Sequence, residues 1–188
     1  MSSITQPDVA EVSWFSALCD DDYEFLGLPD PALASSWEHC QQIVQAADRS
    51  GFDNVLLPSG YDLGIDATAF AAAIATHTEQ IHLLLAVRMG EMWLPQLARQ
   101  IATVDQFAGG RLNVNIISSD IPGEALESTP RYQRTREWMQ VLRKLLNRES
   151  IDFHGDFVDL RLDPPRASTV DGTCPPFYFG GFSAAAKD

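Results

Sequence analysis

Hydrophobic positions change their period at regular intervals along the chain. Runs with a strand-like pattern alternate with stretches in which apolar residues recur every three or four positions, as on one face of a helix. The predicted strands are EVSWFSAL (11–18), DNVLLP (53–58), IHLLLAV (81–87) and RLNVNII (111–117). The predicted helices cover residues 37–47, which end near Ser50-Gly51, and residues 67–75, 94–104 and 132–147.

The pattern changes after the fourth predicted helix. Residues 151–160, IDFHGDFVDL, predict a hairpin of two short strands around His154-Gly155-Asp156. A proline-rich loop over 163–176 leads to a fifth predicted strand, FYFGG (177–181), and residues 182–188 resemble the first turn of a helix. Repeated strand–helix units indicate an α/β protein with a parallel sheet and helices packed outside it.

Periodicity leaves two architectures open, a doubly wound sheet and a (β/α)8 barrel. Both place functional groups at the carboxyl ends of the strands. The chain has 188 residues, 45% of them hydrophobic, which is enough to bury the core of one domain. Residues 1–188 are therefore treated as a single domain.

Charge and composition exclude several classes of partner. Thirteen basic and 26 acidic residues give a net charge of −13, which disfavours nucleic acid and anionic membranes. The longest apolar runs are far shorter than the ~20 residues of a membrane span. Three scattered cysteines without metal spacing suit a reduced, cytoplasmic compartment. No phosphate-loop, dinucleotide-binding or zinc motif occurs, and we expect no metal.

Small polar residues gather where the predicted strands end. They are Pro58-Ser59-Gly60, Arg88, Ser118-Ser119-Asp120, and Gly180-Gly181 with Ser183. Hydroxyls and backbone N–H groups at helix starts suit a phosphate. Asn115 lies in the middle of an apolar strand, so its amide needs partners. A heterocyclic ligand edge and a neighbouring loop are equally good candidates.

Charged residues near the third and fourth helices allow a structural and a functional interpretation. RYQRTREW (131–138) is either a solvated face or a segment that places Tyr132 and one arginine over a phosphate. For Asp105 and Arg111, which flank Gly109-Gly110, we predict a structural ion pair rather than catalysis.

The run LPQLARQIATVDQFAGGRLNVNIISSD (94–120) resembles a segment of the bacterial-luciferase-like flavin monooxygenases. WF on the first strand, QIVQAADRSGFDNVLLPSG, LLLAVR, RYQRTREWMQVLRKLL, DFHGDF and PPFYFGG follow in the order that this family shows. Within the family the chain is most similar to the alkanesulfonate monooxygenases.

This resemblance implies a (β/α)8 TIM-type barrel of which the chain holds about the first five strands. It also implies reduced FMN supplied by a separate NAD(P)H:FMN reductase, with O2 and a small-molecule substrate, an alkanesulfonate that yields an aldehyde and sulfite. Asn115 and Ser118 would contact the flavin and its tail, while Tyr132, Gly181 and Ser183 would approach its phosphate. Arg88 would lie near the substrate sulfonate or the isoalloxazine ring of the flavin. We also expect a homo-oligomer.

The chain departs from the family pattern in two respects. No cysteine lies between Cys40 and Cys174, although the sulfonate branch has one after the second strand. The chain also stops after five strands, whereas a complete barrel needs about 250 residues. We therefore expect the barrel domain to be incomplete at its C-terminus, with the catalytic residues of the later half absent. Two alternatives remain: a non-catalytic shortened barrel that binds flavin or a partner, and a family member with another substrate.

Overall fold

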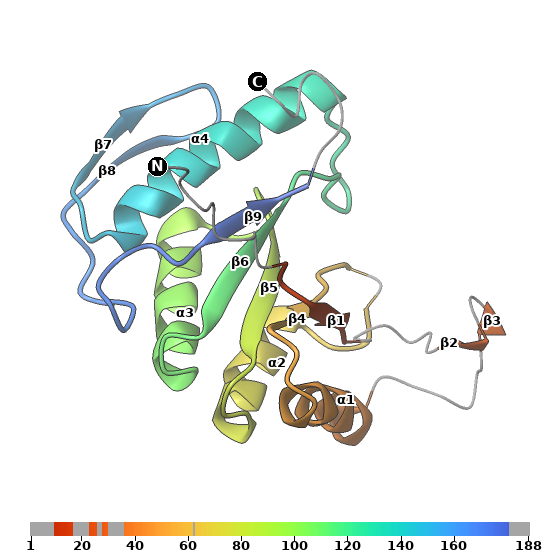
Figure 1. The fold of residues 1–188 in the computed structure, drawn as a ribbon. Helices are drawn as coiled ribbons and strands as arrows, with labels where there is room; N and C mark the ends of the chain where they lie inside the picture. The colour runs from red at the N-terminus through yellow and green to blue at the C-terminus, as the bar shows by residue number, and fades with distance from the viewer. Residues whose placement is uncertain (1–9, 17–22, 26–27, 30–35, 62, 181–188) are drawn as a thin grey trace, which may run out of the picture.

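Five strands pair in parallel in the order β1-β4-β5-β6-β9 (Figure 1). A computed structural model describes residues 10–16, 23–25, 28–29, 36–61 and 63–180. The sheet strands are β1 (Ser13–Phe15), β4 (Asn54–Leu57), β5 (His82–Arg88), β6 (Leu112–Ile117) and β9 (Phe177–Phe179). The helices are α1 (Trp37–Arg49), α2 (Ala67–Ile74), η1 (Ala75–His77), α3 (Leu94–Phe107) and α4 (Ser128–Leu146).

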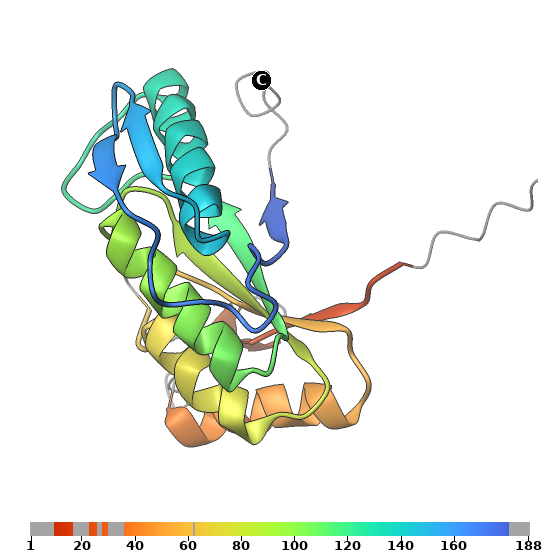
Figure 2. The same ribbon diagram turned by 90° about the vertical axis from the view of Figure 1, so that its left-hand side faces the viewer.

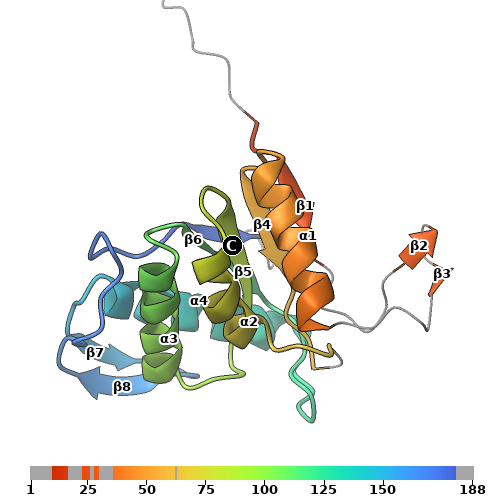
Figure 3. The ribbon, with the colours of Figure 1, turned by 90° about the horizontal axis from the view of Figure 1, so that it is seen from below.

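The strand order decides between the two architectures that periodicity left open. A doubly wound sheet reverses its strand order at a switch point, whereas a barrel adds each strand beside the previous one. Here the order follows the chain without reversal, and α3, α2 and α1 lie in a row beside β6, β5 and β4 (Figure 3). The helices cover one side of the sheet only (Figure 2). The described strands therefore form part of a barrel wall, as predicted.

Alternation along the central strands separates two faces. Leu83, Leu85 and Val87 of β5 belong to the cluster that packs against the helices, as do Leu112, Val114 and Ile116 of β6. The residues between them point to the opposite face, which we call the inner face. In β5 the inner-face residues Leu84 and Ala86 are buried as well, which explains why this strand is an almost unbroken apolar run.

The helix boundaries follow local capping chemistry. Ser36 accepts a hydrogen bond from the His39 N–H at 3.1 Å, and Asp66 accepts one from the Ala69 N–H at 2.7 Å. Helix α4 begins at Ser128, a turn before the predicted residue 132. Its first turn is polar and carries no apolar stripe, so periodicity places the start too late.

Two short antiparallel pairs accompany the sheet. β7 (Ile151–His154) and β8 (Asp159–Leu162) form the predicted hairpin. β2 (Tyr23–Phe25) and β3 (Leu28–Pro29) form a second pair that the sequence pattern does not predict, because its strands are only three and two residues long. The predicted helical turn at 182–188 lies outside the described residues. In the part of the chain that the structure describes, no helix is long and apolar enough to cross a membrane.

A buried carboxylate joins the hairpin to α4. Glu137 is 9% exposed and accepts hydrogen bonds from the backbone N–H groups of Asp156, Phe157 and Val158 at 2.8–3.2 Å. A Cβ at Gly155 would collide with the Glu137 carboxylate, so the hairpin turn requires glycine there. The DFHGDF motif is thus a backbone cradle for one side chain.

The opposite end of the sheet, where the strands begin, is held by Arg111 and Asp48. Arg111 donates to the carbonyl oxygens of Ala75, Thr78 and Ile81, the last at 2.6 Å. Asp48 accepts from the N–H groups of residues 79, 80 and 81 at 2.7–3.0 Å. Burial alone would raise the pKa of Asp48, but these three N–H groups and the charge of Arg111 outweigh it and lower the pKa.

The predicted ion pair between Asp105 and Arg111 is wrong, because each has other partners. Asp105 Oδ2 accepts a hydrogen bond from the Val170 N–H at 2.8 Å and so fixes the long loop that precedes β9. Arg111 instead binds the carbonyls around η1. Gly109 and Gly110, with φ of +62° and +84°, form the turn between α3 and β6.

Replacing Asp48 with Asn should lower the free energy of unfolding at pH 7 by about 1–3 kcal/mol, because the three N–H groups lose a charged acceptor. The pKa of Asp48 in the folded state lies below the unfolded value of about 3.9, so its contribution is complete above that pH and disappears as pH falls through the folded pKa. Urea unfolding at pH 7 and pH 3 measures both. The exposed Asp163→Asn is the control, and a difference between Asp48→Asn and wild type that does not shrink as the pH falls below 3.9 would contradict this account.

Replacing Glu137 with Ala should lower the free energy of unfolding by about 2–4 kcal/mol, because two part-buried N–H groups and the buried Val158 N–H lose their acceptor. Hydrogen exchange of the Asp156, Phe157 and Val158 amides should accelerate more than that of β5. Glu149→Ala, at an exposed position on the same segment, should change little. Equal losses in the two variants would show that the Glu137 hydrogen bonds do not stabilise the hairpin.

Candidate functional site

The carboxyl ends of β4, β5 and β6 meet around Arg88. Its Nη1 donates to the Asp120 carbonyl at 3.1 Å and its Nη2 donates to the Ser59 carbonyl at 3.2 Å. The side chain is 13% exposed and lies 3.9 Å from the Glu91 carboxylate. Arg88 therefore ties the loops after β4 and β6 together at the mouth of the sheet. Its Nε–H is buried and has no hydrogen-bond partner in the described part of the chain.

Two asparagines on the inner face of β6 differ in their partners. Asn113 is 6% exposed and donates to Asn54 Oδ1 at 2.7 Å. Asn115, one step nearer the carboxyl end, lies between Ala86 and Tyr178 in the sheet register and is half-buried. Within the described residues its amide makes no side-chain hydrogen bond, so the predicted alternative of a neighbouring-loop partner is not realised. Its donors and acceptor are available to a ligand.

Beyond the end of β6, serine hydroxyls follow the two asparagines of its inner face. Ser118 Oγ lies 2.9 Å from Thr135 Oγ1, which links the strand end to α4. The hydroxyl of Ser119 is buried without a hydrogen-bond partner among the described residues, and so is that of Ser16 at the end of β1. The sequence pattern pointed to Ser118 and Ser119 at this strand end, although only Ser118 was assigned a flavin contact, and it did not point to Ser16. The only available signal was a small polar residue at a strand end, which all three share.

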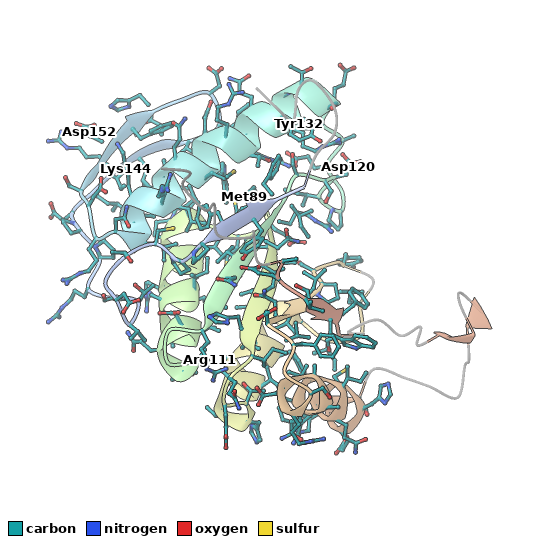
Figure 4. All side chains as sticks on the ribbon, viewed as in Figure 1. Met89, Arg111, Asp120, Tyr132, Lys144 and Asp152 are labelled. Carbon is teal, nitrogen blue, oxygen red and sulfur yellow. The ribbon has the colours of Figure 1, made fainter. Side chains whose placement is uncertain are left out.

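Tyr132 lies at the same end of the molecule. Its ring packs edge-on against Phe179 at the end of β9, with 6.2 Å between ring centroids and an interplanar angle of 79°. Figure 4 shows Tyr132 and Asp120 together at this end and Arg111 at the opposite one. The structure thus brings Arg88, Asn115, Ser118 and Tyr132 to one end of the sheet. Gly181 and Ser183 lie outside the described residues.

The loop between β6 and α4 is held by two ion pairs. Arg131 Nη1 lies 2.5 Å from Asp120 Oδ1, and the buried Arg134 pairs with Glu124. Gly90 packs directly against this loop with φ of +108°, and a Cβ there would lie 2.9 Å from the Arg134 guanidinium. Arg136 is exposed. Two of the three arginines of RYQRTREW therefore have structural partners.

The polar groups at this end are amides, hydroxyls and a guanidinium. In the part of the chain that the structure describes, no group of three or more His, Cys, Asp or Glu side chains is placed to hold a metal ion. Cys174 precedes β9 and so lies at the opposite end of the sheet, where burial raises its pKa to about 12 and keeps its thiol protonated at neutral pH. A cavity of about 380 Å³ lies instead on the outer face between α2 and α3. The unpartnered Asn115 amide and Ser119 hydroxyl fit the polar edge and tail of a flavin.

The sequence profile described as luciferase-like monooxygenase matches residues 25–188. The chain belongs to this family of monooxygenases.

Two curated relatives are named sulfoquinovose monooxygenase. The protein from Novosphingobium aromaticivorans is 62% identical over 185 residues, and the match covers 95% of this chain and 51% of that protein. The protein from Agrobacterium fabrum is 47% identical over 184 residues, covering 96% and 48%. The chain therefore spans about half the length of the curated relatives it matches.

Solved structures of low identity share the fold. An EDTA monooxygenase from Chelativorans sp. BNC1 has a TM-score of 0.80 at 19% identity, over 95% of this chain and 51% of that one. A riboflavin lyase solved with modified FMN and riboflavin has a TM-score of 0.79 at 16% identity, over 95% and 52%. A coenzyme F420-dependent reductase from Methanopyrus kandleri has a TM-score of 0.71 at 20% identity, over 92% and 51%. Neighbours in fold thus use FMN or F420.

Replacing Arg88 with Lys should lower the free energy of unfolding by about 1–2 kcal/mol, although the charge is retained. The single ammonium group of lysine does not reproduce the two guanidinium nitrogens of Arg88, which donate separately to the Ser59 and Asp120 carbonyls. Chemical unfolding beside the exposed Arg99→Lys measures the difference. Equal stability of the two variants would mean that Arg88 does not hold the two loops together.

Proposed function

We propose that this chain forms the flavin-binding half of a monooxygenase that acts on sulfoquinovose with reduced FMN and O2. The reaction would oxidise the carbon that bears the sulfonate to an aldehyde and release sulfite, with oxidised FMN and water as the other products. A separate NAD(P)H:FMN reductase would supply the reduced flavin. A cytoplasmic location and a homo-oligomeric state remain part of this proposal.

The observation that supports the substrate most strongly is the 62% identity to a sulfoquinovose monooxygenase over 95% of this chain. From the family resemblance we expected an alkanesulfonate. The two curated relatives instead name sulfoquinovose, which shares the sulfonate and differs in the remainder of the molecule. We therefore keep the sulfonate chemistry and assign the sulfonated sugar.

The inner face and the strand ends provide the groups that such a reaction needs. Asn115 would hydrogen-bond the edge of the flavin ring, and the hydroxyls of Ser118 and Ser119 would bind its polar tail. Tyr132, with Gly181 and Ser183, would approach the phosphate. Bound reduced FMN supplies the electrons that activate O2.

Arg88 is our candidate for the substrate sulfonate. Its guanidinium lies at the centre of the mouth, and two of its nitrogens are already fixed by backbone carbonyls. A preformed orientation lowers the entropic cost of holding an anion. The nearby Glu91 carboxylate, 3.9 Å away, offsets part of the positive charge and would disfavour a second anion.

A chimera tests the function of this half directly. Residues 1–188 replace the matching half of the Novosphingobium relative, so that the remaining half of that protein completes the barrel. With a flavin reductase, NADH and FMN, the chimera should release sulfite from sulfoquinovose, and omission of FMN or O2 should abolish release. The unmodified relative is the positive control. A folded chimera that binds reduced FMN but releases no sulfite would contradict the substrate assignment.

A further inference from the structure

Four side chains form a continuous hydrogen-bonded chain across the inner face. Asn113 Nδ2 donates to Asn54 Oδ1 at 2.7 Å, and Asn54 Nδ2 donates to Glu11 Oε2 at 3.1 Å. The Tyr178 hydroxyl donates to the same Glu11 oxygen at 2.8 Å. We call Asn113, Asn54, Glu11 and Tyr178 the inner polar chain.

The inner polar chain joins the two edges of the sheet. Glu11 lies just before β1 and Tyr178 lies in β9, so the bond between them connects the first and last strands of the five-stranded order. A flat sheet of five strands would hold these edges about 19 Å apart at the usual strand spacing. The contact therefore requires the sheet to curl, with the tyrosine side chain spanning the concave side.

Tyr178 is the sheet neighbour of Asn115. The two residues are paired in register on adjacent parallel strands, so both side chains leave the same face about 4.8 Å apart. A flat ligand that reaches the free Asn115 amide from inside the barrel must therefore lie against the tyrosine ring. This neighbour relation follows from the register alone.

Glu11 fixes the direction of that ring. Because Glu11 precedes β1, the Tyr178 hydroxyl points toward the end of the sheet where the strands begin, and the carboxyl ends stay open. The hydrogen bond to Glu11, followed by burial, raises the pKa of Tyr178, so the hydroxyl remains a donor at neutral pH. The ring thus has one orientation, set by a carboxylate 167 positions away in the sequence.

We propose that Tyr178 is a positioning residue for the flavin: held by Glu11, its ring forms the floor on which the flavin ring rests beside Asn115. This inference rests on the proposed function, because it requires flavin at the inner face. It gives Tyr178 a role that the family resemblance does not assign and gives Glu11 an indirect role through Tyr178.

Tyr178→Phe keeps the ring and removes only its hydrogen bond to Glu11. Anaerobic titration of the 188-residue chain with reduced FMN, followed by tryptophan fluorescence, should give a Kd at least fivefold higher than wild type. Glu11→Ala should match it, whereas Glu11→Gln, which retains an acceptor oxygen, should stay within twofold of wild type. Tyr61→Phe removes a hydroxyl from a 75% exposed ring and is the matched control.

Two further readouts separate positioning from stability. The visible circular dichroism of bound oxidised FMN should change in Tyr178→Phe and not in Tyr61→Phe, because it reports how the flavin is oriented. Thermal unfolding shows that each variant is folded at the titration temperature. A folded Tyr178→Phe with wild-type Kd and wild-type flavin dichroism would overturn the positioning role alone. A folded wild-type chain that does not bind reduced FMN would overturn both this role and the proposed flavin site.

Discussion

The structure depends on the separation of two faces along β5 and β6. Leu83, Leu85 and Val87 bury one face against the helices, and this burial leaves the alternate residues to line the other. Because helices cover only one side, polar groups on the inner face do not compete with the core. Because the strands are parallel, their carboxyl ends meet at one edge. The candidate site is a consequence of these two conditions.

Contacts that stabilise the fold lie at the end of the sheet where the strands begin, and polar groups available to a ligand lie at the end where the strands finish. Where the strands begin, Arg111 and Asp48 bind backbone groups of the segment between α2 and β5, and neither side chain is available to a ligand. Where they end, the Ser119 hydroxyl is buried without a hydrogen-bond partner and the Asn115 amide makes no side-chain hydrogen bond, as far as the described residues go. This division matches the usual arrangement of barrel enzymes, whose sites lie at the carboxyl ends of the strands. Gly109-Gly110-Arg111, which contributes to the family resemblance, thus stabilises the fold and lies away from the candidate site.

Sequence periodicity predicted the sheet strands, the four long helices and the β7–β8 hairpin, because each depends on local alternation or capping. It did not distinguish Asn113 from Asn115, since both alternate with apolar residues on β6. Asn54, 59 positions before Asn113, accepts a hydrogen bond from the Asn113 amide. No such bond joins Asn54 to Asn115. Asp105 was paired with Arg111 because they are close in sequence, yet its partner is Val170, 65 positions away. Contacts of this range leave no periodic signal.

Substrate choice is not set by the fold. Neighbours with TM-scores near 0.8 include an EDTA monooxygenase and a riboflavin lyase, at identities below 20%. The sulfonate assignment rests instead on relatives of much higher identity, and it concerns a chain that covers about half of each. The central claim does not depend on the substrate: the residues at the described strand ends, Asn115 first among them, bind flavin.

Anaerobic titration of the wild-type chain and of Asn115→Leu with reduced FMN tests that claim most directly. Leucine has the branched shape of asparagine, with methyl groups in place of the amide oxygen and nitrogen, so it offers no hydrogen bond to the flavin edge. The account predicts saturable binding by wild type and at least a tenfold higher Kd for the folded variant, which corresponds to about 1.4 kcal/mol. Equal affinity of the two proteins, or no binding by folded wild type, would contradict it.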